Sequence, residues 1–368
     1  MNNNDENDKI IIANEVNNSK KIQIYYYFYI LRIISSFAIV LIHVTAEYFT
    51  KCKIQSNDFK ISFFYNGFSR FGVPIFFMIS GALFLNRDLS FTKMYSKYIK
   101  RLLIHLISWS FIYSLTNFHL SKKSIKIIIF KFFSGHYHLW FLYSMIGLYI
   151  ITPFLREIAK KDDLLKMFIL LSIVFSFLFP NFNIIISYYS NSYYNILNYT
   201  YFFLDLKYIS GNVFYFMIGY YLNNNNTKLN YFITIFIFII GISGTLFIFK
   251  LSYNIVLKDK KKKTLFFQPE YLHIAVYSIS IFILIKNHFT NKKLSKIYLI
   301  NIISNNAFGI YLAHPLIIEK TKQYRIFKFT LFIKLIYRIP IITSFIYLFS
   351  LLISIMIKYI PLIGEYLF

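Results

Sequence analysis

Long apolar segments, separated by short polar linkers, run through most of this chain. Segments of about 18–22 apolar residues recur along it, close to the roughly 20 residues that a helix needs to cross a bilayer. Backbone groups in lipid have no partners except one another, so each segment is predicted to be an α-helix. The pattern therefore predicts an all-α fold, a polytopic integral membrane bundle of about ten transmembrane helices. The expected spans are 25–47, 62–86, 101–118, 138–156, 164–180, 206–222, 231–250, 270–287, 299–319 and 340–358.

The first residues differ in composition from the rest of the chain. Residues 1–21 are polar and rich in Asn, so they are expected to form a disordered tail. Residues 22–368 show no internal repeat and are expected to form a single ten-helix membrane domain. The first span is too long for the apolar core of a signal peptide and lacks a small-residue cleavage site, so no cleavable signal is expected. The polar and aromatic segment 181–205 is expected to lie on the membrane surface or to cap a cavity.

Composition supports a membrane protein and excludes several other classes. The chain is 57% hydrophobic with a mean hydropathy of +0.53, which is too apolar for a soluble protein of 368 residues. The net charge of +25 comes from basic residues in the linkers, where they would meet lipid headgroups, so no nucleic-acid partner is predicted. The single cysteine, Cys52, excludes an intrachain disulfide and a cysteine-based metal cluster, and no metal site is predicted.

The distribution of Lys and Arg between alternate linkers is nearly even. The basic cluster Arg87–Arg101 after the second span favours a cytoplasmic N-terminus, whereas Lys258–Lys263 and the segment 320–338 favour the opposite orientation. Early spans usually dominate topology. The expected location is therefore the cytoplasmic membrane, crossed several times, with the N-terminus in the cytoplasm.

A polar stripe runs along the first span through Arg32, Ser36, His43 and Glu47. Charged groups at this depth cost about 2.5–3.5 kcal/mol each and tend to mark function. His43 follows Arg32 by 11 residues, close to three turns, so the two lie on one face about 16 Å apart. A neutral histidine can take a proton from a hydroxyl that attacks an acyl carbonyl. Glu47, one turn later, would orient the ring.

Arg32 would bind a phosphate or a carboxylate. The alternative for this stripe is purely structural: a buried histidine bonded to a backbone carbonyl, and an arginine that snorkels to the headgroups.

The second span carries Arg70 at its entry, then Pro74, then the pair Ser80-Gly81. Pro74 removes a backbone donor and is expected to kink the helix. The small Ser80-Gly81 pair would let a neighbouring helix or a ligand approach closely. The alternative is an interfacial arginine and ordinary helix packing.

The fourth span opens with His136, His138 and Trp140. Residues two apart do not share a helix face, so a zinc pair within this helix is not expected. Trp140 and the neighbouring tyrosines suit an interfacial aromatic belt. The belt does not explain His138, which stays a candidate for binding.

The ninth span contains Tyr311, His314 and Pro315, with Glu319 near its end. A histidine followed by a helix-breaking proline predicts a local opening of the helix that faces a cavity. The alternative is a packing kink with a locally bonded histidine.

Together these motifs resemble the membrane-bound acyltransferase 3 family, which includes bacterial carbohydrate O-acetyltransferases. The resemblance covers about residues 24–358, nearly the whole chain. Its four blocks occur in family order: Arg32-x10-His43; Arg70-x3-Pro74-x-Phe-Phe-x-x-Ser80-Gly81; His138-Leu-Trp-Phe-Leu-Tyr143 with Gly147-Leu-Tyr149-x-x-Thr-Pro153; and Tyr311-x-x-His314-Pro315.

The resemblance implies a ten-helix membrane enzyme that transfers an acyl group, usually acetyl from acetyl-CoA, to a hydroxyl of a surface or exported carbohydrate. Acetyl-CoA would be a donor substrate, with no tightly bound cofactor. The implied partners are the lipid bilayer, acyl-CoA, a carbohydrate acceptor and polysaccharide biosynthesis proteins. Some family members carry an extra hydrolase-like domain, and this chain is expected to be of the stand-alone type.

The resemblance makes His43 the catalytic histidine, with Glu47 as its predicted orienter. The predicted substrate- and donor-binding residues are Arg32, Arg70, Ser80, His138, Trp140, Tyr311 and His314. The competing hypothesis is a transporter or flippase for polysaccharide or lipid-linked sugar that makes no bonds. A histidine–glutamate pair beside Arg32 favours the enzyme, because transport does not require it.

Overall fold

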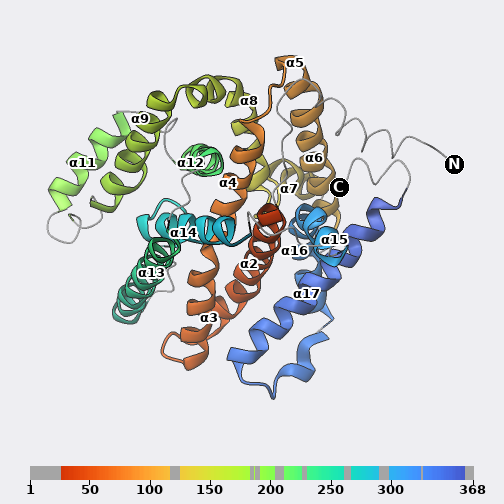
Figure 1. The fold of residues 1–368 in the computed structure, drawn as a ribbon. Coiled ribbons are helices and arrows are strands. Elements are labelled where there is room, and N and C mark those ends of the chain that lie inside the picture. The colour runs from red at the N-terminus through yellow and green to blue at the C-terminus, as the bar shows by residue number, and fades with distance from the viewer. Residues whose placement is uncertain are drawn as a thin grey trace.

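The computed structural model describes most of the chain as helix (Figure 1). It describes residues 26–116, 125–182, 186, 191–203, 211–225, 230–260, 267–289, 298–324 and 326–360. No strand occurs in these ranges, so the predicted all-α class is confirmed there. The predicted tail, residues 1–21, lies outside the described residues.

The elements are α2 (Tyr26–Lys51), α3 (Asn57–Phe68), η1 (Ser69–Phe71), α4 (Gly72–Phe84), α5 (Phe91–Lys93), η2 (Met94–Ile99), α6 (Lys100–Thr116), α7 (Ile125–Ser134), α8 (Trp140–Lys160), α9 (Asp162–Ile173), η3 (Val174–Leu178), α11 (Asn191–Phe203), α12 (Asn212–Asn224), α13 (Tyr231–Asp259), α14 (Leu272–Phe289), α15 (Tyr298–Asn305), α16 (Ala307–Gln323), η5 (Ile326–Thr330) and α17 (Leu335–Lys358).

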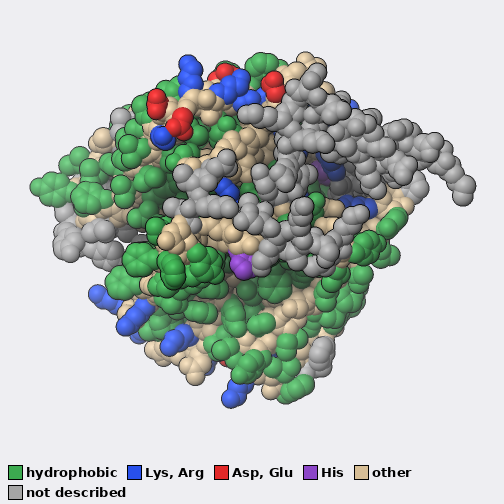
Figure 2. All heavy atoms as spheres, in the orientation of Figure 1, with side chains coloured by type: hydrophobic (Ala, Val, Ile, Leu, Met, Phe, Trp, Pro, Cys, Tyr) green, Lys and Arg blue, Asp and Glu red, His purple; other side chains and the backbone are tan. Residues whose placement is uncertain are grey.

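Several helices are long and apolar enough to cross a bilayer, which makes this a multi-pass helical membrane protein. Seven helical segments within the described ranges meet that condition: Tyr26–Lys51, Asn57–Phe84, Trp140–Lys160, Asp162–Phe182, Tyr231–Asp259, Leu272–Phe289 and Leu335–Lys358. The other three predicted spans correspond to α6, to α12 and to the pair α15–α16, so the number ten is approximate. In the view of Figure 2, hydrophobic side chains cover the flanks of the molecule, and charged side chains lie near the top and the bottom of the view.

Helix α2 is the central element of the bundle. It contacts α3, α4, α14, α15, α16 and α17, and more than half of its apolar stretch is buried inside the protein. The polar stripe of Arg32 and His43 is therefore surrounded by other helices instead of lipid. This burial explains how ionisable groups can be kept at membrane depth.

The α-helix of the second span is interrupted before Pro74. The 3₁₀ turn Ser69–Phe71 separates α3 from α4 and carries Arg70. Pro74 is the third residue of α4, and proline is tolerated in a first turn because the N–H there has no helical partner. The change from α-helix to 3₁₀ turn thus precedes Pro74, and the kink expected at this proline stays a prediction.

Helices α4 and α12 approach each other through glycines. A Cβ atom on Gly81 would lie 1.7 Å from the backbone oxygen of Phe216, and one on Gly219 would lie 2.1 Å from the backbone oxygen of Met78. Two backbones can meet this closely only where both helices lack a side chain. The predicted close approach of a neighbour at Ser80-Gly81 is therefore confirmed for Gly81.

Part of the segment 181–205, predicted to cover a cavity or the membrane surface, forms helix α11. This helix lies at the outer edge of the bundle beside α9 (Figure 1), and several of its large side chains are exposed. They are Tyr193, Ile196, Tyr199 and Phe203.

Candidate active site

Three histidines that are far apart in the sequence meet inside the bundle. The ring centroids of His43 on α2 and His314 on α16 are 5.0 Å apart. The ring of His138, just before α8, lies 5.7 Å from that of His314, and Tyr137 lies 5.1 Å from His43. The structure thus brings together the histidines that the sequence singled out. We call His43, His138 and His314 the histidine cluster.

Pro315 determines how the His314 ring is held. The proline has no N–H for the carbonyl of Tyr311, four residues earlier, and His314 Nδ1 lies 2.7 Å from that oxygen. A carbonyl only accepts hydrogen bonds, so Nδ1 carries the proton and Nε2 keeps its lone pair. Nε2 is buried and has no partner among the described residues. The helix continues through Pro315 to Gln323, so the predicted opening of this helix is wrong: the side chain of His314 satisfies the freed carbonyl.

A second chain of hydrogen bonds orients His138. The Nδ1 atoms of His136 and His138 are 2.7 Å apart, and His136 Nε2 lies 3.0 Å from a carboxylate oxygen of Glu319. If His136 donates Nε2–H to Glu319, its Nδ1 accepts from His138, whose Nε2 then keeps its lone pair. His138 Nε2 is also buried without a described partner. In this arrangement His138 and His314 each present an unprotonated nitrogen inside the bundle.

Sequence reasoning missed His136, Tyr137 and Glu319 as site residues. It placed His136 and His138 on different faces of a helix, but both lie in the turn before α8, which begins at Trp140. The periodicity argument does not apply to a turn. The run His136-Tyr137-His138, directly before an apolar span, was the sequence signal that could have indicated these site residues.

Tyrosines fix the histidine-bearing elements to one another. The Tyr311 hydroxyl donates to the backbone carbonyl of His138. Tyr113 on α6 donates to the carbonyl of Leu312 at 2.7 Å, and its ring stacks on that of His136 with centroids 4.2 Å apart. Predicted residue Tyr311 thus contributes by positioning the His138 turn against α16.

Arg70 is linked to the His43 turn through Asn66. The guanidinium donates from Nε and Nη2 to Asn66 Oδ1, at 3.1 Å and 2.5 Å. Asn66 Nδ2 in turn donates to the carbonyl of Ile42 and to Thr45 Oγ1, both at 3.0 Å. Arg70 is also close enough to interact electrostatically with His43. Asn66 was not predicted, although it holds Arg70 and α2 in register.

Substitution of Asn66 by alanine is expected to destabilise the protein. It would leave the Arg70 guanidinium without the amide oxygen that accepts two of its N–H groups, and hydrogen bonds to charged groups contribute about 1.5–3 kcal/mol. Thermal unfolding of the detergent-purified protein measures the loss. The matched control is Asn57→Ala at the exposed start of α3. Equal stability of both variants would show that the Asn66 bridge contributes nothing.

Arg32 lies at the opposite end of α2 from Lys51. It interacts electrostatically with Tyr149 and with Arg87, and Arg87 donates to the Tyr98 hydroxyl at 3.1 Å. The basic group at this end is thus separated from the histidine cluster by about three helical turns, as the spacing predicted.

Besides Arg32, three predicted site residues do not join the histidine cluster. The carboxylate of Glu47 pairs with Lys51 at 2.6 Å and with Lys322 at 3.3 Å, so the structure gives it lysine partners in place of the predicted contact with His43. Ser80 donates to a carbonyl of its own helix. Trp140 is 43% exposed on the outside of the bundle, which agrees with the alternative of an interfacial belt.

The geometry defines a class: a helical membrane protein with a buried histidine cluster between two basic ends. Within the described ranges, no group of three His, Cys, Asp or Glu side chains is arranged to hold a metal ion. A family model described as an acyltransferase domain matches residues 25–359. The chain therefore belongs to this acyltransferase family, the acyltransferase 3 group, and is an acyltransferase. No curated protein matches the chain, and no solved structure does.

Proposed function

We propose that this membrane acyltransferase moves an acetyl group from acetyl-CoA to a hydroxyl of a surface or exported carbohydrate. It would work in the cytoplasmic membrane with its N-terminus inside, beside the enzymes that make the polysaccharide. The observation that carries the proposal is the pairing of His43 with His314, 5.0 Å apart, at a position on α2 between the Arg32 end and the Lys51 end. Each end would serve one substrate.

The donor would enter at the Arg32 end. Coenzyme A carries phosphate groups, and arginine binds phosphate through a planar fork of donors. The positive charges of Arg32 and Arg87 are close enough there to repel each other, so a phosphate group between them would relieve this repulsion, about 16 Å along α2 from His43. An extended pantetheine arm would then carry the thioester from the basic end to the histidine cluster.

The chemistry would begin at His43. Its unprotonated nitrogen removes the proton of the acceptor hydroxyl as that oxygen attacks the thioester carbonyl. A carbon–oxygen bond forms, the carbon–sulfur bond breaks, and the proton passes from His43 to the departing thiolate. Arg70 retains guanidinium N–H groups beyond the two that bind Asn66, and these would stabilise negative charge on the carbonyl oxygen. The free nitrogens of His138 and His314 would accept hydrogen bonds from the acceptor.

Labelled acetyl-CoA tests the proposed function. Membranes from cells that express the chain should transfer label to glycan, and mild alkali should release it because esters are base-labile and amides are not. Membranes that lack the chain are the control. Glycan that crosses the membrane normally while no acetyl ester forms would instead support the transporter hypothesis.

Substitution of Arg32 by glutamine is expected to raise the KM for acetyl-CoA about 10–100-fold with a smaller change in kcat. One charge-assisted hydrogen bond contributes about 1.5–3 kcal/mol, and every 1.4 kcal/mol is tenfold in affinity. Steady-state kinetics in nanodiscs gives both constants. The control is Lys60→Gln, an exposed charge on α3 near the opposite end. A KM that does not change would remove Arg32 from the donor site.

A further inference from the structure

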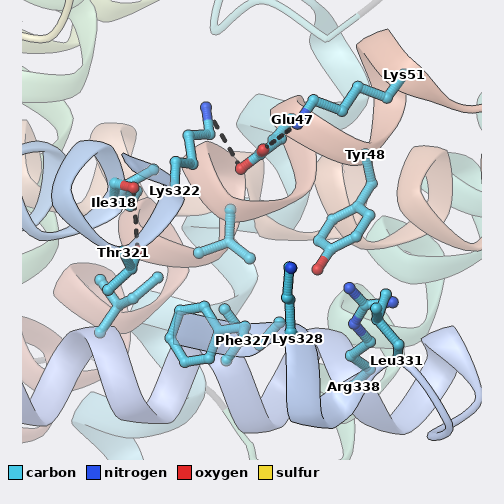
Figure 3. A pocket seen from close by; sticks show the side chains of 13 residues that line it. Glu47, Tyr48, Lys51, Ile318, Thr321, Lys322, Phe327, Lys328, Leu331 and Arg338 are labelled. Carbon is cyan, nitrogen blue, oxygen red and sulfur yellow. Dashed lines mark hydrogen bonds and ion pairs between the residues drawn. The ribbon is translucent and has the colours of Figure 1, made fainter. Parts of the chain in front are cut away.

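A pocket opens at the Lys51 end of α2, opposite the basic group around Arg32. Its volume is about 310 Å³, within the roughly 300–1,000 Å³ of small-molecule sites. Residues of α2, α16 and α17 and of the η5 region form its walls (Figure 3). The sequence did not predict it, because its lining residues are distributed between the two ends of the chain.

Positive charge exceeds negative charge on the pocket lining. Four cationic side chains line it against a single carboxylate, that of Glu47; they are Lys51, Lys322, Lys328 and Arg338. Glu47 pairs with Lys51 and with Lys322. The remaining two, Lys328 and Arg338, form no ion pair with a described carboxylate.

Arg338 is held in place without an anion. Its guanidinium carbon lies 5.4 Å from the centre of the Tyr48 ring, and its Nε is buried with no hydrogen-bond partner among the described residues. Lys328, from the η5 region, lines the same pocket (Figure 3). A buried donor without an acceptor is costly. The guanidinium also hydrogen-bonds the Tyr48 side chain, and its further N–H groups could pair with a carboxylate or phosphate group of a ligand, which a guanidinium binds through parallel hydrogen bonds.

The pocket lies next to the histidine cluster. Two of its lining residues, Glu47 and Ile318, follow His43 and His314 by four residues each. Four residues are one helical turn, about 6 Å. Both helices thus lead from the histidines directly to the pocket, and a molecule seated in it would have one end close to His43.

We propose, on the basis of the function proposed above, that this pocket binds an anionic acceptor. The carboxylate or phosphate group of a sugar unit pairs with Lys328 and Arg338, and a hydroxyl of the same molecule reaches His43. The apolar faces of Tyr48 and Phe327 cover the ring of the sugar. The enzyme therefore selects acidic carbohydrate over neutral carbohydrate.

Binding of sugar probes to the purified full chain in nanodiscs of neutral lipid tests this proposal. The probes are methyl β-D-glucuronide, glucose 6-phosphate and the neutral methyl β-D-glucoside, titrated by ligand-detected NMR without acetyl-CoA. At least one anionic probe should bind about tenfold or more tightly than the glucoside, the scale of one charge-assisted hydrogen bond. Lys328→Gln and Arg338→Gln should each remove most of this preference. The exposed Lys334→Gln, at the start of α17 and outside the pocket, should keep it.

A substitution of Glu47 is expected to strengthen binding of the anionic probe, whereas those of Lys328 and Arg338 weaken it. The Glu47 carboxylate competes with the ligand for Lys51 and Lys322, so Glu47→Gln should tighten the binding of the anionic probe several-fold. Unchanged or weaker binding in this variant would contradict an acceptor pocket.

Three further results would overturn the proposal. They are equal affinity for the anionic and neutral probes, a preference that survives both pocket substitutions, and loss of anionic-probe binding when phosphatidylglycerol is added to the nanodiscs. The last result would identify a lipid phosphate as the occupant. These measurements need no acyl transfer, so their failure is distinct from failure of the proposed function, which would appear as absence of ester with the unmodified chain.

Discussion

Substitution of His43 by alanine is expected to reduce acyl transfer by about 10²–10⁴-fold, the usual contribution of a positioned general base. The ring has His314 on one side and Tyr137 on the other, at centroid distances of 5.0 Å and 5.1 Å. His43 is the one histidine of α2, and in the proposed arrangement the nitrogens of His138 and His314 are occupied by hydrogen bonds from the acceptor. The loss should appear in kcat, with little change in acetyl-CoA affinity, because the donor phosphates are bound about three turns away. Transfer of labelled acetyl to glycan gives the rate.

The matched control is His288→Ala, which removes an exposed histidine in the last turn of α14. Thermal unfolding of both variants separates loss of chemistry from loss of fold. Preserved acyl transfer in a folded His43→Ala protein would falsify the catalytic role of this histidine. Equal loss in both variants would also contradict it.

Substitution of Gly81 by alanine is expected to cause a large loss of stability. The new Cβ atom would lie 1.7 Å from the backbone oxygen of Phe216, and no side-chain rotation can relieve a clash with backbone. Overpacking in a well-packed interior costs typically about 1–3 kcal/mol and occasionally more. Helix α4 would have to move away from α12, and Arg70, in the 3₁₀ turn directly before α4, would move with it. The apparent Tm of the detergent-purified protein and the fraction that stays monodisperse after heating measure the effect.

Gly147→Ala on α8 is the control for this substitution. A Cβ atom on Gly147 meets nothing within 4 Å, and alanine is a better helix former than glycine by about 1 kcal/mol. The control should therefore match or exceed the stability of the unmodified protein. If Gly81→Ala behaves like Gly147→Ala, the two backbones are not in contact at this crossing.

The positions of Arg32 and His43 along α2 could be predicted from the sequence. Their separation follows from the fixed rise of an α-helix, so it needs no information about neighbouring helices. The same reasoning placed Glu47 one turn beyond His43 and predicted His43 as the partner of its carboxylate. Lys322, which is distant in sequence, binds it because α16 packs beside α2.

His136 and Glu319 show where periodicity stops being informative. The first lies in a turn and the second on α16, and their contact at 3.0 Å depends on how that turn packs against the helix. Asn66 was overlooked for a related reason. An asparagine has no distinctive pattern in sequence, and its role becomes visible only when its donors and acceptors are placed.

By itself the sequence determined the class of this protein, an all-α membrane bundle, because lipid offers backbone groups no partner outside a helix. It also determined which ionisable residues share the first helix, since helical spacing is a local property. The tertiary structure alone decided which polar groups meet: three histidines from three elements, Arg70 with Asn66, and the cationic pocket between α2, α16 and α17. Such contacts are made between helices, and the packing that produces them depends on shape complementarity along whole helix faces instead of on any single motif.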